Sequence, residues 1–347
     1  MGKTVEQIEK TDKSGGAEAG SRWFIVVNPH AGSGRTAREW DRIKDCLDRN
    51  GISYEYRMTD CRYHATEMVF DASREGFRRF IAVGGDGTIH EVLGGIMLYL
   101  DSLLPASASA EDAVSRSPRP CLSDFSVAVI PVGSGNDWIR CHNIPDNPEE
   151  IVRLVKSGSF ARQDVVRVTT DAGVTYMVNI GGSGFDARVC ERVNRCKDKG
   201  KRGRMLYIWS LVHNFFTYKP SPMEISLDGK ALFSGDCFSV AVGTGKYSGG
   251  GMRQTPEAVS DDGLMDVTVI PPLPFMKIAA EIRRLFDGSF LKVRELVAGR
   301  CRRLTVAPAG NAPDIVEVDG EIVGRLPATF EVLGEQICVL DRKVRRP

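Results

Sequence analysis

The stretch Phe80-Ile81-Ala82-Val83-Gly84-Gly85-Asp86-Gly87-Thr88 decides how the first half of this chain folds. Residues 80–83 (FIAV) predict a short buried strand, and residues 89–93 (IHEVL) predict the start of a helix. The glycines between them permit positive φ angles and leave no Cβ atom in the way of an anion. We therefore expect a phosphate site where the N–H groups of the loop and of the helix N-terminus converge. An ordinary turn of the same composition is the alternative that these residues alone leave open.

Two further strands are followed by loops of the same kind. Residues 24–27 (FIVV) predict a buried strand that leads into 28–34 (NPHAGSG), and residues 127–130 (VAVI) predict another that leads into 131–137 (PVGSGND). In an open parallel sheet, such loops gather at the carboxyl edge, where these sheets bind ligands. None of the loops has the spacing of a Walker A motif or of a Rossmann fingerprint. The pattern indicates a phosphoryl-transfer enzyme.

Length and patterning predict two domains. The 347 residues, 42% of them apolar, are enough to bury two cores. Strand-like and helix-like segments alternate up to about residue 158, which predicts an α/β half, whereas short alternating segments after residue 162 predict antiparallel β-structure with one helical interruption at 205–216. The predicted organisation is a disordered tail, an α/β domain and a β-rich domain, at residues 1–20, 21–160 and 161–334.

The three loops and a set of later motifs together resemble the diacylglycerol kinase catalytic family, the lipid kinases that also include sphingosine and ceramide kinases. The later motifs follow in the order expected for that family, at 179–187 (NIGGSGFDA), 249–252 (GGGM), 261–267 (DDGLMDV) and 318–321 (VDGE). The resemblance covers nearly the whole chain. It implies an α/β nucleotide-binding domain like that of NAD kinases and phosphofructokinases, an antiparallel β-sandwich domain for the lipid substrate, and a return of residues 335–347 to the first domain.

The resemblance also implies which residues bind the cofactors. For ATP it implies Asn28, Pro29, His30, Ala31, Gly32, Thr59, Gly84, Gly85, Asp86, Gly87, Thr88, Glu91, Gly133, Ser134, Asn136 and Asp137. Ser134 replaces the commoner threonine of the family and keeps its hydroxyl. For Mg²⁺ the resemblance implies the carboxylate of Asp262 and the backbone carbonyls of Val259 and Leu264, which are hard oxygen ligands for a hard cation.

Phosphoryl transfer to an alcohol needs a positioned γ-phosphate, a cation that offsets its charge and a carboxylate within reach of the acceptor hydroxyl. The catalytic candidates are Asp86, which lies between glycines of the first loop, and Asp319 and Glu321. The resemblance implies that the Asp-Gly-Glu segment supplies the general base, and we favour Glu321 over Asp319. His64 and His90 are interpreted as packing or helix-start residues, because carboxylates suffice for this chemistry.

The predicted function is an ATP- and Mg²⁺-dependent lipid kinase that phosphorylates the hydroxyl of diacylglycerol or a related lipid alcohol. One alternative is a kinase of a soluble substrate, since NAD kinases and phosphofructokinases share a Gly-Gly-Asp-Gly-type loop. The Asn28 loop and the Asp262 and Glu321 segments disfavour that alternative. The other alternative is a lipid- or nucleotide-binding module without activity, which retention of the expected acids and glycines disfavours. No motif encodes which lipid is the acceptor.

The sequence predicts a cytoplasmic protein at the membrane surface. It shows no signal peptide and no apolar run of membrane-spanning length, and its nine cysteines lack paired CxxC spacing, so we expect reduced thiols and no zinc site. The net charge of +1 hides a basic cluster at 195–204, directly before the apolar segment 206–211 (LYIWSL).

This combination predicts peripheral contact with an anionic membrane, to which each cation contributes ~1 kcal/mol. A solvated loop followed by a core helix is the alternative. Nucleic acid is not an expected partner, because no recognised binding fold accompanies the charge. A homodimer is compatible with the sequence, which carries no signal for the oligomeric state.

Overall fold

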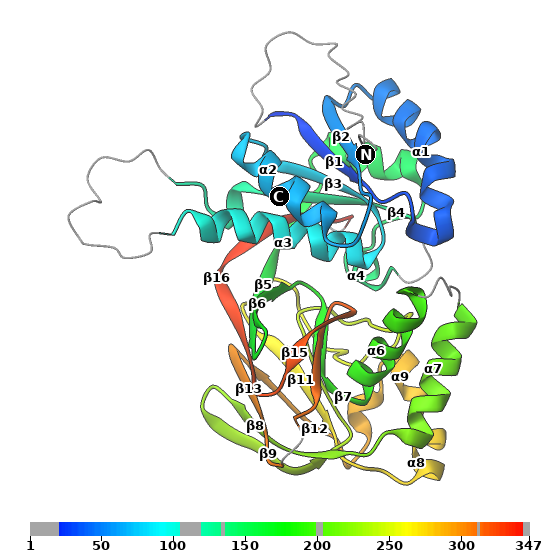
Figure 1. Ribbon diagram of the computed structural model, residues 1–347, viewed down its shortest axis with the longest axis vertical. Helices are drawn as coiled ribbons and strands as arrows, with labels where there is room; N and C mark the ends of the chain where they lie inside the picture. The colour runs from blue at the N-terminus through cyan, green and yellow to red at the C-terminus, as the bar shows by residue number, and fades with distance from the viewer. Residues whose placement is uncertain (1–20, 105–118, 133–135, 199–203, 311–312, 343–347) are drawn as a thin grey trace, which may run out of the picture. The chain divides into compact units, whose positions relative to one another are not determined.

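The computed structural model describes the chain over residues 21–104, 119–132, 136–198, 204–310 and 313–342 (Figure 1). The chain divides into two compact units, which fall within residues 1–133, 142–162 and 335–347 for the first and 134–141 and 163–334 for the second. Neither unit is one continuous segment, because the chain passes between them more than once. The domain limits drawn from the sequence at residues 160 and 334 stay a prediction.

The first unit is built on a parallel sheet with the strand order β2-β1-β3-β4. Its strands are β1 (Trp23–Val27), β2 (Tyr54–Met58), β3 (Arg79–Gly84) and β4 (Ser126–Pro131). The inner strands are almost entirely buried, as parallel strands covered on both faces must be. The last residues of β16 (Ala328–Leu340) run parallel to β4, with Cys338 opposite Ser126. The segments that follow β1 to β4 therefore meet at one edge of the sheet.

Helices connect these strands. They are α1 (Ala31–Arg49), α2 (His64–Arg74), α3 (Asp86–Ser102), the short 3₁₀ helix η3 (Leu122–Asp124) and α5 (Pro148–Ser157). Helix α2 packs against α3 (Figure 1). Helix α1 packs against α5. Trp40, Ile43 and Leu47 form the buried apolar face of α1. The side chain of Asn147 caps α5 by accepting the N–H of Glu149 (2.9 Å), which defines where this helix begins.

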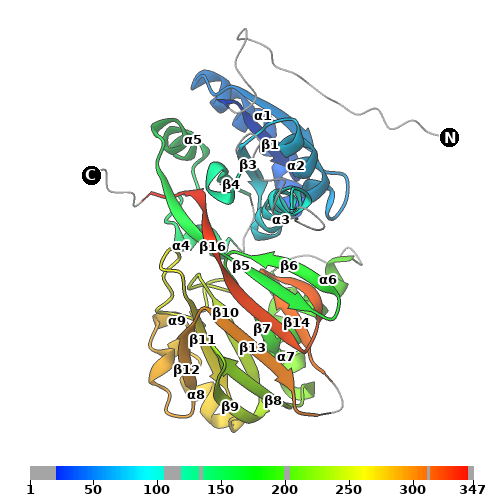
Figure 2. The same cartoon turned by 90° about the vertical axis from the view of Figure 1, so that its left-hand side faces the viewer.

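The second unit is an antiparallel β-sandwich. One sheet has the order β12-β11-β10-β7-β14-β15. Its strands, in chain order, are β7 (Ile180–Gly184), β10 (Ser239–Gly243), β11 (Met265–Ile270), β12 (Val297–Cys301), β14 (Ile315–Val318) and β15 (Glu321–Arg325). The other sheet contains β5 (Phe160–Thr170), β6 (Gly173–Met177), β8 (Ser221–Leu227), β9 (Lys230–Cys237), β13 (Arg303–Pro308) and the first part of β16. Figure 2 shows β13, β8 and β9 side by side. Apolar residues of both sheets, among them Val242, Val267, Leu304 and Phe330, form one core between them.

Strand β7 carries the glycine-rich run 180–184 in the middle of its sheet. A Cβ atom at Gly181 would lie 2.7 Å from the carbonyl oxygen of Glu317, and one at Gly182 would lie still closer to the carbonyl of Val240. The neighbouring strands thus approach as closely as only glycine allows. The glycines of the motif at 179–187 therefore have a packing role of their own.

The predicted fold class, an α/β part followed by an antiparallel β-sandwich, is confirmed. The prediction of a single helical interruption in the second half is wrong. Besides α7 (Arg204–Thr217), the chain after residue 162 contains α6 (Phe185–Asp198), α8 (Phe275–Glu281), α9 (Arg284–Asp287) and the 3₁₀ helix η4 (Phe290–Lys292). The short helix α4 (Asp137–Cys141), which precedes that part of the chain, also belongs to this unit. Helix α6 follows β7 without a break and is rich in charged residues, so its sequence gives little apolar periodicity.

Candidate active site

In the first unit, the residues after β1 and β3 are joined through Asn28. Its backbone N–H donates to the carbonyl of Val83 (3.0 Å), and its side-chain nitrogen donates to Oγ1 of Thr88 (3.3 Å). The side-chain oxygen of Asn28 accepts the N–H of His30 (3.0 Å). Asn28 therefore fixes the start of the predicted nucleotide loop 28–32 against the first turn of α3.

The Gly-Gly-Asp-Gly-Thr segment is more helical than the sequence indicates. Helix α3 begins at Asp86, and the extended residue Gly85 is its N-cap. A Cβ atom at Gly84 would come closer than 3.0 Å to Oγ1 of Thr88, so glycine at this position is what lets the helix start directly at the strand end. The first N–H groups of α3 are thus directed to the edge of the sheet beside Asn28, an arrangement suited to an anion.

Thr59 and Glu91 also lie in the first unit, and their contacts are structural. The backbone N–H of Thr59, which is buried, donates to the carbonyl of Val27 (2.9 Å) after β2 ends. The carboxylate of Glu91 accepts the N–H of Ala65 (3.1 Å) in the first turn of α2. Burial raises the pKa of Glu91, against the opposing effect of hydrogen bonds from the backbone of Tyr63 and Ala65. The structure thus gives Glu91 a partner in α2 rather than at the sheet edge.

The residues predicted at the end of β4 fall in different places. Gly133 and Ser134 lie outside the described residues. Asp137, preceded by Asn136, belongs to the second unit, where its carboxylate accepts the N–H of Gly250 (2.7 Å) and pairs with Arg140 (3.3 Å). The Gly-Gly-Gly motif recognised in the sequence therefore binds Asp137.

The catalytic candidates Asp319 and Glu321 lie on the hairpin of β14 and β15. Val318 pairs with Glu321, which leaves Asp319 and Gly320 as the two turn residues. Both have positive φ angles, 50° at Asp319 and 87° at Gly320. Asp-Gly is the dipeptide that a type I′ hairpin turn favours, because both central residues need positive φ. The conformation of the turn thus favours Asp-Gly at 319–320 independently of any chemical role of Asp319.

Hydrogen bonding distinguishes Asp319 from Glu321. One carboxylate oxygen of Asp319 accepts the N–H of Val178 (3.1 Å) and the other accepts the N–H of Asn179 (3.0 Å). Both oxygens therefore hold the connection between β6 and β7. The carboxylate of Glu321 lies 3.4 Å from the side-chain nitrogen of Asn194 on α6. Asp319 is thus engaged as a support of the backbone, whereas Glu321 follows the turn as the first residue of β15.

Two acids near this turn have no role in the sequence prediction. Asp186, at the start of α6, accepts hydrogen bonds from Ser239 (2.7 Å) and Gln254 (2.8 Å), and burial raises its pKa. Glu317 lies on β14, and burial raises its pKa to about 8, with Asp186 and Asp319 adding to the shift. A single acid inside the apolar strand 315–318 (IVEV) is the sequence signal that points to Glu317.

The predicted Mg²⁺ ligands Val259, Asp262 and Leu264 do not fit a metal ion as they are arranged. One oxygen of Asp262 accepts the N–H of Leu264 (3.1 Å), and the other pairs with Arg300, which also pairs with Asp266 (3.3 Å). Mg²⁺ demands near-octahedral oxygen ligands. A single carboxylate that a guanidinium already neutralises does not meet this demand. Among the described residues, no three His, Cys, Asp or Glu side chains form a metal-binding group.

Two domain families match the chain. Residues 22–168 match the diacylglycerol kinase catalytic domain, and residues 179–341 match the YegS C-terminal NAD kinase beta sandwich-like domain. Residues 22–168 of this chain belong to the diacylglycerol kinase catalytic-domain family. The resemblance predicted from the motifs is therefore confirmed, and the family is one of lipid kinases.

Two relatives and one solved structure illustrate the match. A "Probable lipid kinase YegS-like" protein of Xanthomonas oryzae pv. oryzae is 27% identical over 304 residues, which are 87% of this chain and 90% of the relative. A diacylglycerol kinase of Mycobacterium tuberculosis is 24% identical over 321 residues, 91% of this chain and 93% of the relative. The crystal structure of a diacylglycerol kinase from Bacillus anthracis str. Sterne has a TM-score of 0.64 at 18% identity and covers 93% of this chain and 97% of that one, which supports the fold.

Proposed function

We propose that this protein is an ATP- and Mg²⁺-dependent kinase that transfers the γ-phosphate to the hydroxyl of diacylglycerol or a related lipid alcohol. The observation that carries the proposal is the Asp-Gly-Glu segment of the β14–β15 hairpin. Asp319 accepts backbone hydrogen bonds with both oxygens, so Glu321, which follows the turn, is the carboxylate of the segment that we assign as the base. We assign nucleotide binding to residues 21–160 with 335–347, and lipid binding to 161–334.

The sheet edge of the first unit supports nucleotide binding. In our proposal the phosphates of ATP accept hydrogen bonds from the N–H groups at the start of α3 and from the Asn28 loop, and Asp86 orients the reacting groups. The positive end of the α3 dipole, equivalent to roughly half an elementary charge, favours an anion there. Mg²⁺ offsets the charge of the phosphates when it is bound. We take it as the counter-ion that ATP brings, because the Asp262 set does not fit a separate ion.

The hairpin supports the proton transfer. In our proposal Glu321 takes the proton of the lipid hydroxyl, whose oxygen then bonds to the γ-phosphorus while the bond from that phosphorus to ADP breaks. Asp319 supports the turn through the backbone of Val178 and Asn179. We therefore expect the two carboxylates to behave differently when each is changed to its amide.

The test is transfer of labelled γ-phosphate from Mg-ATP to a panel of lipids in mixed micelles, with NAD and fructose 6-phosphate included. A labelled lipid supports the proposal and names the acceptor. Label on NAD or on the sugar would replace it with a soluble-substrate kinase, and bound ATP without transfer would favour a binding module. Glu321→Gln should lower kcat by ~10²–10⁴-fold without changing the urea unfolding midpoint. Glu224→Gln, the same change on an exposed residue of β8, is the matched control.

We also propose that the protein reaches its lipid by peripheral contact with anionic membranes through α7. Trp209, Val212 and Phe216 of this helix are 52%, 47% and 73% exposed, and their spacing places them on one face. The guanidinium of Arg192 lies 4.4 Å from the ring centroid of Trp209, and Arg195 is exposed. Residues 199–203 of the predicted basic cluster lie outside the described residues. In the described part of the chain, no helix is long and apolar enough to span a bilayer.

Sedimentation with phosphatidylglycerol and with phosphatidylcholine vesicles tests the membrane proposal. Changing both Trp209 and Phe216 to alanine should weaken binding to anionic vesicles at least tenfold, because their exposed apolar area no longer enters the interface. The control changes two exposed apolar residues outside α7, Leu98 and Val174, to alanine. Equal binding of both double variants would refute the role of α7.

A further inference from the structure

The side chain of Asn194, on α6, contacts the hairpin of β14 and β15 at two points. Its nitrogen donates to the carbonyl oxygen of Gly320 (3.0 Å) and lies 3.4 Å from a carboxylate oxygen of Glu321. The carbonyl of Gly320 and the N–H of Glu321 belong to the same peptide unit. The bond to this carbonyl therefore orients the backbone from which the Glu321 side chain starts, and the second contact holds the carboxylate at its end.

Both partners of the Asn194 amide are hydrogen-bond acceptors. A backbone carbonyl and an ionised carboxylate have no hydrogen to donate, so the nitrogen of the amide faces the hairpin. Its two hydrogens are enough for the two oxygens. Aspartate has the same shape as asparagine, but it would set an oxygen against the carbonyl of Gly320 and the carboxylate of Glu321. The position therefore calls for a donor, and not only for a side chain of this size.

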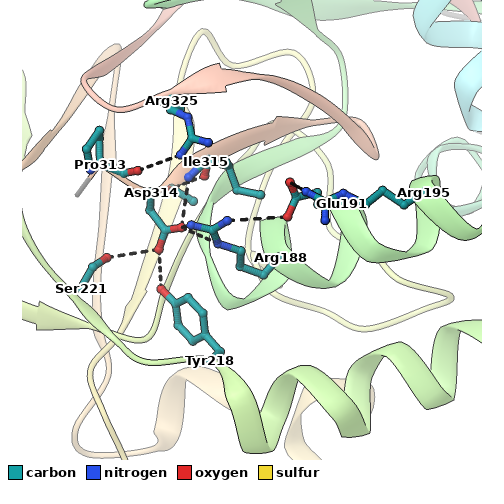
Figure 3. Close-up of polar contacts among 10 residues, drawn as sticks. Arg188, Glu191, Arg195, Tyr218, Ser221, Pro313, Asp314, Ile315 and Arg325 are labelled. Carbon is teal, nitrogen blue, oxygen red and sulfur yellow. Dashed lines mark hydrogen bonds and ion pairs between the residues drawn. The ribbon is translucent and has the colours of Figure 1, made fainter.

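Helix α6, which carries Asn194, is itself fixed to the hairpin, and it packs against both β14 and β15. Figure 3 shows Arg188 of α6 and Tyr218 directed at the carboxylate of Asp314, the residue before β14. The distances to this carboxylate are 2.9 Å from Arg188 and 2.6 Å from the Tyr218 hydroxyl. The thiol of Cys190, one helical turn before Asn194, donates to the same backbone carbonyl as Asn194 (2.9 Å). The amide of Asn194 thus starts from a helix that is attached at both ends of β14.

We propose that Asn194 is a positioning residue of the kinase site, whose side-chain amide orients Glu321 for proton transfer. The inference rests on the proposed function, in which Glu321 takes the proton of the lipid hydroxyl. A general base must lie within hydrogen-bond reach of the proton that it takes, so a carboxylate that turns away from the hydroxyl is ineffective. Asn194 therefore acts on kcat through Glu321, and it does not act on the binding of ATP or of the lipid.

A double-mutant cycle tests whether Asn194 acts through Glu321. We would measure kcat for the wild type, Asn194→Ala, Glu321→Gln and the double variant, with the lipid that the labelling panel identifies and with diacylglycerol as the first probe. Asn194→Ala should lower kcat at least about tenfold and leave the KM values for ATP and lipid within about twofold. In the Glu321→Gln background the same change should lower kcat less than about twofold, because the carboxylate that the amide orients is gone. Equal losses in both backgrounds would overturn the inference.

Asn194→Asp separates hydrogen-bond donation from packing. Because this variant keeps the shape of the side chain and loses the donor, it should lower kcat at least as much as Asn194→Ala. The matched control is Asn50→Asp at the end of α1, where the amide of Asn50 also donates to a backbone carbonyl, that of Cys46 (2.8 Å). This control should keep kcat within about twofold of the wild type. Wild-type kcat in Asn194→Asp would show that donation is not needed, and the inference would fall.

The outcomes separate this inference from the proposed function. If the wild type phosphorylates a lipid and Glu321→Gln does not, while both Asn194 variants keep wild-type kcat, the inference fails and the kinase proposal stands. A wild type that phosphorylates no lipid overturns the kinase proposal and the positioning role with it. If Asn194→Ala does not fold, the cycle is run with Asn194→Asp, whose unchanged shape preserves the packing of α6.

Discussion

Replacement of Glu317 by glutamine should change how the stability of the protein depends on pH. Burial, with smaller contributions from Asp186 and Asp319, raises the pKa of this carboxyl from 4.5 to about 8 in the folded chain. The unfolded chain therefore releases the proton at lower pH than the folded chain. The free energy of unfolding consequently falls as the pH rises from 4.5 towards 8. Since one pKa unit is worth about 1.4 kcal/mol, the wild type should lose roughly 3–4 kcal/mol between pH 5 and pH 8 from this group, and little more above pH 8.

Urea unfolding followed by tryptophan fluorescence measures this effect in the wild type and in two variants. Glu317→Gln stays neutral in both states, so it should match the wild type at pH 5 and exceed its unfolding free energy by roughly 3–4 kcal/mol at pH 8. Titrating groups that do not interact with Glu317 are common to the proteins and cancel in the difference, so Asp186 and Asp319 are the groups whose own titration the substitution also changes. Glu224→Gln, on an exposed part of β8, should follow the wild type. Parallel loss of stability in the wild type and Glu317→Gln would refute the reasoning.

Two further changes test the other sites. Gly84→Ala should weaken ATP binding at least tenfold, measured by equilibrium dialysis, because its Cβ atom would collide with the first turn of α3. Gly94→Ala, where the nearest atom is 3.5 Å from the new Cβ, should bind ATP normally. Arg300→Gln frees the carboxylate of Asp262, so Mg²⁺ at millimolar concentration should raise the melting temperature of this variant and not that of the wild type. Arg302→Gln is the exposed control, and an equal shift in all three proteins would contradict the assignment.

The strands of the first unit could be predicted well because short runs of consecutive residues identify them. Strands β1, β3 and β4 are buried on both faces and appear in the sequence as uninterrupted apolar runs. Parallel pairing then brings the ends of these strands together, so the proximity of Asn28 and Thr88 follows from the strand order. Glu91 shows the limit of this reasoning. Its place in the first turns of a helix is predictable, whereas its bond to Ala65 depends on how α2 packs against α3.

The sites of the second unit could be predicted only in part, because their contacts join distant segments. Arg300 reaches Asp262 and Asp266 because antiparallel pairing of β11 with β12 sets it opposite Asp266. No motif contains both partners. The electrostatic interaction of Glu317 with Asp186, at the start of α6, likewise depends on the position of a helix that the sequence did not indicate. The motifs thus predicted the position of the acidic turn in the sequence. Which acids lie near this turn depends on the strand register, which the motifs do not contain.

The five residues 317–321 have roles both in the fold and in the proposed reaction. Asp319 and Gly320 provide the positive φ angles of the turn, Asp319 also holds the backbone after β6, and Glu317 holds the Gly320 peptide. A binding module without activity would need these same features to keep its hairpin, so the presence of the motif does not by itself separate an enzyme from a binder. Glu321 differs because it follows the turn as the first residue of β15. Its carboxylate can be changed to an amide without altering the turn, which makes this position the one where chemistry and fold can be tested apart.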